Sequence, residues 1–232
     1  MRICFVSKGT LGEFREQTKE TKETKETENE TLSETERADI VLFGFGGGVE
    51  VSYERELKGE TNYFEEAALL SKSGKNIVVC GYTTNARGHK RRSVLVAENG
   101  RLAGVSDMLN VIDGECASGA ALRVYETKAG RMGVVVAEDL NFPDVVRSLA
   151  ICGSDFIVCP FGRSENVHTS LLRAHAYCYG VPIFFCADGY CMIADVSGAI
   201  AFASPQSPVF ADFKPRKQYH LVETRHRGLF RE

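Results

Sequence analysis

The sequence predicts a single α/β domain in which strands and helices alternate. The clearest sign is the stretch 130–160, which reads GRMGVVVAEDLNFPDVVRSLAICGSDFIVCP. Two apolar runs, 134–136 and 156–158, have the length and composition of buried strands. Between them the Phe-Pro pair at 142–143 opens a helix with apolar residues on one face. Strand, helix and strand in this order predict a βαβ unit.

Length, composition and charge limit the class of protein. The length of 232 residues fits one domain, 1–232, and the hydrophobic share of 44% and charged share of 25% are typical of ordinary globular proteins. The formal net charge of −3 favours no particular kind of partner. No apolar run approaches the roughly 18 residues of a membrane span, and the amino terminus lacks a signal-peptide pattern. We therefore expect a cytoplasmic protein that does not contact membranes.

The eight cysteines do not indicate disulfides or a metal site. Four of them lie in apolar, strand-like runs: Cys4, Cys80, Cys159 and Cys186. No C-x-x-C pair and no zinc-ligand spacing occurs. We expect these thiols to be reduced and buried, and we expect no metal.

The amino-terminal part combines a predicted strand with an unusual charged segment. Residues 1–7 (MRICFVS) predict the first strand. Between Phe14 and Leu32 there is no apolar residue, and 18–26 consists of three successive Thr-Lys-Glu triplets. This period places Lys and Glu at spacings that support a helix, but it provides nothing to bury. We interpret about 15–37 as a solvated helix or a partly disordered insert, with a docking surface as the alternative.

The next part alternates strands with a helix. The run 38–44 (ADIVLFG) predicts a strand, and the glycines at 46–48 predict a tight turn, since the pattern of a phosphate loop is missing. A helix is predicted over 63–72 and a strand over 76–81. Helix and strand together extend the α/β pattern.

A basic cluster and a hairpin follow. The cluster 87–92 (RGHKRR) could contact nucleic acid, but it is short and has no interleaved aromatic residues, so a hairpin loop is favoured. The basic tail at 225–227 is equally small. We expect no nucleic-acid partner. Residues 93–104 (SVLVAENGRLAG) predict a strand, an Asn-Gly turn and a second strand.

The remaining pattern again alternates. A strand is predicted over 122–127 and a helix over 168–176, where His168 and His175 could share one face. Without a third ligand we expect these histidines to lie at the surface or to be hydrogen-bonded. The chain then continues as a strand, a hairpin, a Pro- and Ser-bearing crossing and a last strand: 181–187, 191–203, 204–215 and 219–223.

The stretch 130–160 resembles the nitrilase (carbon-nitrogen hydrolase) superfamily. That family's elbow is written G-x-x-G-v-x-I-C-y-D-x-x-F-P-E, followed by an arginine-bearing helix and a G-A-D-x-x-x-x-P strand. The matching residues here are Gly130, Gly133, Asp139, Phe142, Pro143, Asp144, Arg147, Gly153, Asp155 and Pro160. The resemblance covers essentially the whole chain and is weakest at the repeat. It implies an α-β-β-α four-layer sandwich, a homodimer or higher homo-oligomer that pairs across a helical layer, and no cofactor.

The resemblance also implies three catalytic positions, and all three are apolar here. The family's general-base glutamate falls on Phe45, its lysine on Met108 and its cysteine nucleophile on Ala137. A phenyl ring accepts no proton, a thioether carries no charge to stabilise an oxyanion, and a methyl group cannot attack a carbonyl or nitrile carbon. Glu115 is the candidate for a second, supporting glutamate of the family.

The sequence is compatible with two functions. The first is a nitrilase-like protein without catalysis, which binds a small amide- or nitrile-like ligand or serves as an assembly module. Its expected pocket residues are Phe45, Met108, Ala137, Glu138, Asp139 and Phe161. The second is an active amide or nitrile hydrolase in which Cys159 replaces the nucleophile, with Glu138, Asp139 or Glu115 as base. The first is favoured because a free cysteine in a strand is usually part of the core.

Overall fold

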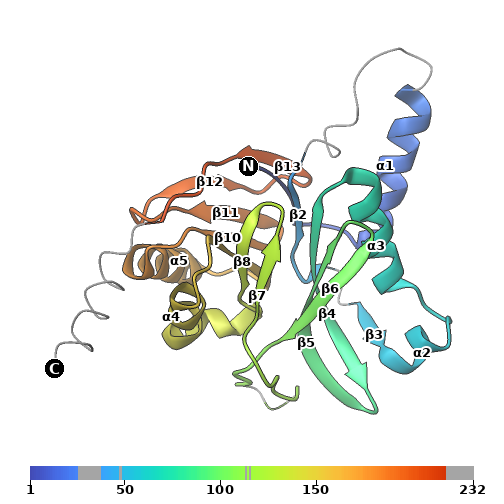
Figure 1. Ribbon diagram of the computed structural model, residues 1–232, viewed down its shortest axis with the longest axis horizontal. Helices are drawn as coiled ribbons and strands as arrows, with labels where there is room; N and C mark the ends of the chain where they lie inside the picture. Colours follow the sequence, from blue (N-terminus) through green and yellow to red (C-terminus); the bar gives the residue numbers. More distant parts are fainter. Residues whose placement is uncertain (26–37, 47–48, 113, 115, 218–232) are drawn as a thin grey trace.

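Two β-sheets face each other and helices cover the outer face of each (Figure 1). The computed structural model describes residues 1–25, 38–46, 49–112, 114 and 116–217. The predicted α-β-β-α four-layer sandwich is confirmed, and with it the α/β class.

The first sheet has seven strands in the order β13-β1-β2-β4-β5-β6, with β3 paired to β4. Its strands are β1 (Arg2–Val6), β2 (Ile40–Phe43), β3 (Glu50–Ser52), β4 (Ile77–Ala86), β5 (His89–Glu98), β6 (Arg101–Asp107) and β13 (Val209–Asp212). The second sheet has six strands in the order β12-β11-β10-β9-β8-β7. Its strands are β7 (Val124–Thr127), β8 (Gly130–Val134), β9 (Phe156–Arg163), β10 (Ile183–Asp188), β11 (Tyr190–Ala194) and β12 (Ile200–Ser204).

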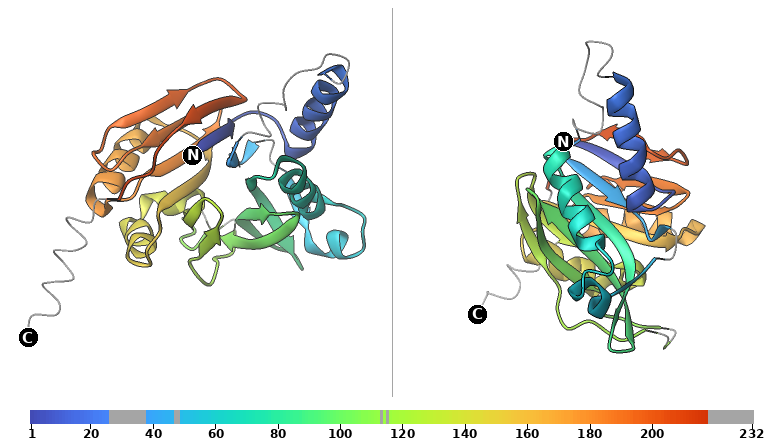
Figure 2. Two further views of the ribbon diagram at one scale, coloured as in Figure 1. Left: turned by 45° about the horizontal axis from the view of Figure 1, so that its top comes forward. Right: turned by 90° about the vertical axis from the view of Figure 1, so that its right-hand side faces the viewer.

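The helices are α1 (Leu11–Lys25), α2 (Tyr53–Leu57), α3 (Tyr63–Gly74), α4 (Pro143–Ile151) and α5 (Asn166–Tyr179), together with the 3-10 helix η3 (Ala137–Asn141). The views of Figure 2 place α1 and α3 against the first sheet and α4 and α5 against the second. No helix in the described ranges is long and apolar enough to cross a membrane.

Central strands of the first sheet, such as β1 and β2, are apolar on both faces because each face packs against another layer. In β1, Ile3 and Phe5 belong to the core between the sheets, whereas Cys4 and Val6 belong to the core beneath α1 and α3. Successive side chains of a strand point to opposite faces, so both sets must be hydrophobic. This is why these central strands appear in the sequence as apolar runs.

The predicted βαβ unit is confirmed. Strands β8 and β9 are parallel, with Met132 opposite Phe156, and α4 connects them. The helix begins at Pro143, where the missing N–H of proline costs no hydrogen bond. The first strand ends at Val134, two residues before the end of its apolar run, because the chain turns there toward η3.

The prediction of a loop over 87–92 was wrong. Strands β4 and β5 pair from Ile77–Glu98 out to Ala86–His89, so most of the basic cluster is strand. Only Arg87 and Gly88 form the turn, and both have positive φ, 52° and 82°. A two-residue turn with this geometry matches the twist of a hairpin.

The two ends of the chain also differ from expectation. Helix α1 starts at Leu11, before the charged repeat, and Phe14 anchors it in an edge-to-face contact with Phe43 at 5.4 Å. The crossing predicted over 204–215 contains β13, which pairs antiparallel with the edge of β1. The strand predicted over 219–223 lies outside the described residues.

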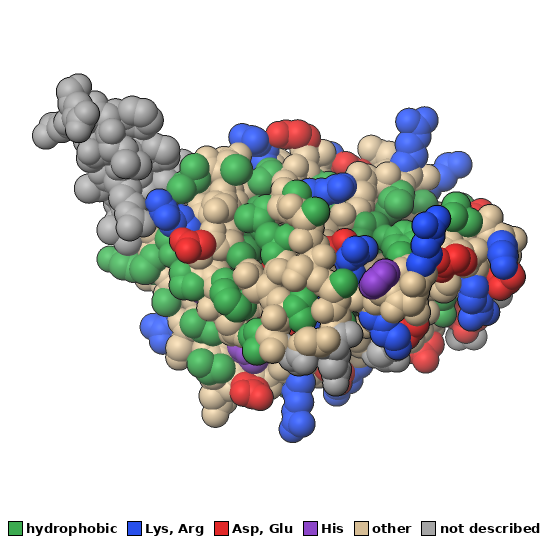
Figure 3. All heavy atoms as spheres, turned by 90° about the horizontal axis from the view of Figure 1, so that it is seen from below, with side chains coloured by type: hydrophobic (Ala, Val, Ile, Leu, Met, Phe, Trp, Pro, Cys, Tyr) green, Lys and Arg blue, Asp and Glu red, His purple; other side chains and the backbone are tan. Residues whose placement is uncertain are grey.

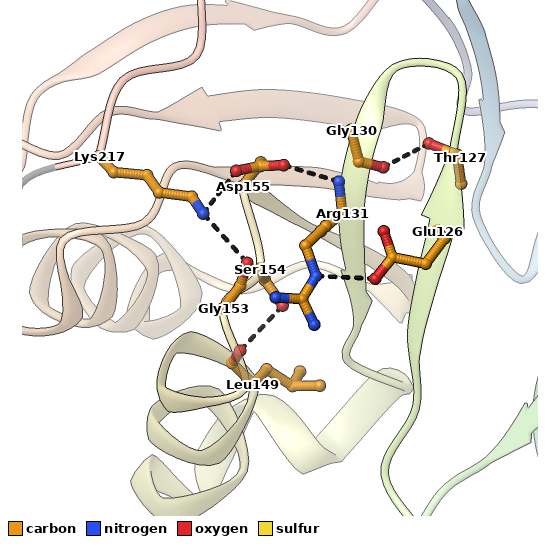
Figure 4. A network of polar contacts seen from close by, with 9 residues as sticks. All are labelled: Glu126, Thr127, Gly130, Arg131, Leu149, Gly153, Ser154, Asp155 and Lys217. Atoms are coloured by element: carbon orange, nitrogen blue, oxygen red, sulfur yellow. Dashed lines mark hydrogen bonds and ion pairs between the residues drawn. The ribbon is translucent and has the colours of Figure 1, made fainter.

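A polar network ties the loop before β9 to β8 and to the end of the described chain (Figure 4). Asp155 accepts a hydrogen bond from the backbone N–H of Arg131 at 2.7 Å and pairs with Lys217 at 2.5 Å. The Lys217 ammonium also donates to the carbonyl of Gly153 at 3.0 Å. Two family-motif residues, Gly153 and Asp155, therefore act in holding the βαβ unit together.

This network predicts an effect of pH. Burial acts to raise the pKa of Asp155, but the hydrogen bonds from Lys217 and Arg131 outweigh it and lower the pKa below 3.8. The ionised carboxylate thus contributes stability above its unfolded pKa, and this stability is lost as the pH falls through the lower folded pKa. In Lys217→Met the folded pKa should rise toward the ordinary value, as measured by carboxyl NMR titration. An unchanged pKa would mean that Lys217 does not hold this carboxylate.

Candidate functional site

The turn between β8 and η3 has an unusual backbone. Ala137 sits at φ 48° and is fully buried. A left-handed conformation costs a non-glycine residue about 1 kcal/mol, and such residues cluster at functional sites. The sharp strand-to-helix turn is that of an elbow which presents one side chain at the end of a strand. Here that side chain is a methyl group.

Asp139 fastens the elbow to the segment after β6. Its Oδ2 accepts from the N–H of Leu109 at 2.8 Å, and its Oδ1 accepts from the backbone N–H and the side-chain amide of Asn110 at 2.9 and 2.8 Å. Burial raises the pKa of Asp139, and these hydrogen bonds oppose the rise. The contact brings Met108, which precedes Leu109, to the same region as Ala137. Both are buried in the core between the sheets.

Phe45 approaches the same core from the end of β2. Its backbone N–H donates to the carbonyl of Phe161 at 3.0 Å, which joins the two sheets at this point. Its ring lies over Gly81, where an added Cβ would be 2.6 Å from the ring. Gly81 therefore makes room for the phenyl ring. The three triad-equivalent positions, Phe45, Met108 and Ala137, all pack in or against the core between the sheets.

A cavity of about 590 Å³ opens beside Phe45 and the elbow. Its lining comes from the ends of β2 and β9, from β4 and β5, from η3 and from the start of α5. The lining residues are Phe45, Val49, Tyr82, Thr83, Arg92, Glu138, Asn141, Phe161, Gly162, Arg163, Glu165, Val167 and His168. Such a position, beyond the carboxyl ends of strands, is where ligands bind in α/β sheets.

Three of the six expected pocket residues lie at this cavity. Phe45, Glu138 and Phe161 line the cavity. Met108, Ala137 and Asp139 are each at most 2% exposed and are not part of its lining. The physical reason is the hydrogen bonding of Asp139, whose two oxygens are directed at the segment after Met108 instead of the cavity.

Several lining residues could not be identified from the sequence. Arg92 comes from β5 and pairs with Glu138 of η3, and both side chains are about a third exposed, 30% and 28%. The second oxygen of Glu138, Oε2, is buried and has no hydrogen-bond partner among the described residues. The alternation of β5 places Arg92 on the same face as Val94 and Val96, which is the only sequence signal for its position.

The basic residues at 90–92 each lie near a carboxylate from another element. Arg92 pairs with Glu138, Lys90 with Glu50 at 2.6 Å, and Arg91 lies 3.9 Å from Asp107. Figure 3 shows Lys and Arg side chains interleaved with Asp and Glu toward the right-hand end of this face. The cations of this cluster are therefore partly neutralised by carboxylates from other elements.

His168 forms part of the cavity wall at the start of α5. Its Nδ1 accepts from the N–H of Glu165 at 2.8 Å, and its ring lies 4.4 Å from that of Phe161. Burial lowers the pKa of His168, so the ring is neutral at pH 7. His175 is also buried and its Nε2 bonds the carbonyl of Leu140 at 2.9 Å. The hydrogen-bonded alternative was thus correct for both, whereas a surface position was not.

The structure places Cys159 away from the cavity. The thiol is fully buried in the core beneath α4 and α5, on the opposite face of β9 from the core between the sheets. Burial, together with the charges of Asp139 and Glu138, raises the pKa of Cys159 well above 9.0. Glu115, one of the three candidate bases for relocated chemistry, lies outside the described residues.

The two facing sheets, the outer helices and the elbow beside a cavity define the class of protein. Solved proteins of the nitrilase superfamily share this fold. Nit3 of Saccharomyces cerevisiae, from branch 10 of the superfamily, matches with a TM-score of 0.70 at 14% identity, covering 100% of this chain and 94% of that one. A carbon-nitrogen hydrolase of Helicobacter pylori G27 gives 0.68 at 14% identity, over 90% and 87%.

An amidase from Nesterenkonia sp. AN1 has also been solved as a double mutant, with one glutamate replaced by glutamine and one cysteine by alanine, in complex with acrylamide. It matches with a TM-score of 0.74 at 15% identity, over 100% of this chain and 96% of that chain. No protein-family model matches the sequence. A probable nitrilase of Schizosaccharomyces pombe is 27% identical over 130 residues, which is 52% of this chain and 47% of that protein. The chain thus has the fold of the nitrilase superfamily, as its sequence motifs predict.

Proposed function

We propose that this chain is a nitrilase-fold protein that has lost amide and nitrile hydrolysis and binds a small molecule in the cavity beside its elbow. One observation carries the proposal. The elbow keeps its left-handed backbone at position 137, while the residue there is alanine. A scaffold that keeps the strained turn but presents only a methyl group retains the frame of a catalytic site without its nucleophile.

The chemistry of the neighbouring positions supports the loss. Phe45 and Met108 supply neither a proton acceptor nor a positive charge, and Met108 is 2% exposed. A single oxyanion donor is worth about 2.7–4 kcal/mol in a hydrolase, so the loss of base, cation and nucleophile together leaves no route for this reaction. Replacing all three also avoids leaving one charge buried without its partner.

Retention of binding is supported by the cavity. Its walls combine two phenyl rings, Phe45 and Phe161, with the Arg92–Glu138 pair, which is the usual mixture of apolar surface and a few polar groups in ligand sites. The Nesterenkonia double mutant in complex with acrylamide is a second support. In that amidase, replacement of a glutamate and a cysteine is compatible with a bound amide.

The rival function, a hydrolase that uses Cys159, is weakened by the position of that thiol. A nucleophilic cysteine needs an accessible thiolate, and Cys159 has neither exposure nor a lowered pKa. Cys152, by contrast, is exposed at the end of α4. The two cysteines therefore provide a direct comparison.

We expect no ammonia release above buffer when the protein is incubated with a panel of amides and nitriles. Iodoacetamide at pH 7.5 should label Cys152 and leave Cys159 unlabelled in the folded protein, because thiolate is scarce at a buried site with a raised pKa. Peptide mass spectrometry reads both positions, and Cys152→Ser is the matched control. Fast labelling of Cys159 together with turnover would establish the hydrolase.

The proposal includes a cytoplasmic location and a homodimer or higher homo-oligomer that pairs across a helical layer. Two apolar side chains on the outer helical layer support the pairing: Ile151 is 43% exposed and Tyr177 50% exposed. We propose no cofactor and no nucleic-acid partner.

A further inference from the structure

We infer that the cavity selects a small organic cation, a protonated primary amine with an apolar body, and that Glu138 receives the ammonium group. The inference rests on the proposed binding function and adds the class of ligand to it. Three features of the cavity wall lead to it: the balance of charge, the state of the Glu138 carboxylate and the arrangement of aromatic rings.

The part of the cavity wall at His168 is acidic. Glu138 and Glu165 both line it, and both act to raise the pKa of His168, so the two charges converge on this part of the wall. Asp139 lies directly behind and its charge interacts with that of Glu138. Arg92 and Arg163 line the cavity as well, and Arg163 is exposed like Glu165, so the negative field is confined to the part of the wall at His168. A cation gains from this field, and an anion loses.

The Glu138 carboxylate can accept further hydrogen bonds. Arg92 uses Oε1, and Oε2 has no hydrogen-bond partner among the described residues. A buried carboxylate oxygen without a partner is costly, and a charged donor relieves that cost best. The last torsion of a glutamate side chain is broad, so rotation can turn either oxygen toward the cavity. An ammonium group supplies three donors in any direction.

The rest of the cavity wall suits the apolar part of such a ligand. Phe45 and Phe161 line the cavity, and the neutral ring of His168 lies tilted against that of Phe161, with the ring centroids 4.4 Å apart. Aromatic faces attract a nearby cation, and they also pack against a hydrocarbon skeleton. The elbow motif has no acidic residue at the position of Glu138, so this recognition belongs to the present chain.

The test compares probes of one skeleton: benzylamine, benzamide and benzoate, each titrated into the full-length protein and followed by NMR shifts of the Gly162 amide. We expect benzylamine to bind at least tenfold more tightly than either other probe. In Glu138→Gln this preference should fall at least tenfold, whereas Glu126→Gln, whose side chain is 75% exposed on β7, should leave it unchanged. Circular dichroism verifies folding, and the wild-type ranking stands as a test even where Glu138→Gln does not fold.

The outcomes separate the two proposals. Tighter binding of benzamide or benzoate, or an unchanged preference in folded Glu138→Gln, overturns the inference about cations and leaves the binding function in place. The absence of any bound compound across a broad thermal-shift library overturns both, because ligands that bind the native state must raise its melting temperature.

Discussion

Replacing Asp139 with alanine is expected to lower the free energy of unfolding by about 3–5 kcal/mol. The carboxylate accepts three hydrogen bonds, from Leu109 and Asn110, and is 1% exposed. Its removal leaves buried N–H groups without acceptors, which costs more than the net gain of forming the bonds. Urea denaturation followed by circular dichroism measures the change. Since whole domains are stable by about 5–15 kcal/mol, the effect is large.

Two further variants separate hydrogen bonding from side-chain volume at this position. Asp139→Asn keeps one acceptor but directs an amide donor at other donors, so we expect roughly half of the loss. Asp144→Asn changes a carboxylate that is 93% exposed on α4 and should cost less than about 1 kcal/mol. A loss in Asp139→Ala no greater than in Asp144→Asn would show that the elbow does not depend on this tether.

Most of the fold could be predicted because its signals are local. The apolar runs, the Phe-Pro helix start at 142–143 and the Asn-Gly turn at 99–100 each act within a few residues, and the structure contains the corresponding elements. The sequence motif also placed Ala137 at a strand-to-helix turn. The positive φ at that residue is what such a turn requires.

The errors concern features that depend on contacts distant in sequence. The basic residues from Lys90 to Arg92 extend a strand because β4 offers a partner along its length and carboxylates from other elements neutralise them. Likewise 209–212 becomes a strand only because the edge of β1 is available. The hydrogen bonds of Asp139 with the segment at 109–110 cannot be deduced from the elbow either.

The same limit applies to the cavity. Arg92 and His168 are 76 positions apart in the chain and meet only through the packing of the two sheets with α5. A resemblance to a family assigns roles at motif positions, and neither residue belongs to the elbow motif at 130–160. The sequence could thus indicate where a reaction is missing, but not which side chains form the wall of the cavity.

Restoring charges at the triad-equivalent positions tests whether they face one another. Met108→Lys places an ammonium at a site that is 2% exposed and should lower the free energy of unfolding by about 3–5 kcal/mol. Phe45→Glu places a carboxylate at a half-buried site and should cost about 2–3 kcal/mol through lost packing and desolvation. Each charge alone lacks a partner.

Combined, the two substitutions should cost about 1–3 kcal/mol less than the sum of the single changes, because the carboxylate and the ammonium can pair. Urea denaturation of the four proteins in the cycle measures this coupling. The matched control is Phe45→Gln with Met108→Lys, which has nearly the same shape but no negative charge, so most of the coupling should disappear. Strictly additive costs would mean that the side chains at 45 and 108 do not meet. The elbow would then be the remnant of a different site, and the proposal that this chain has lost a nitrilase-type triad would lose its main support.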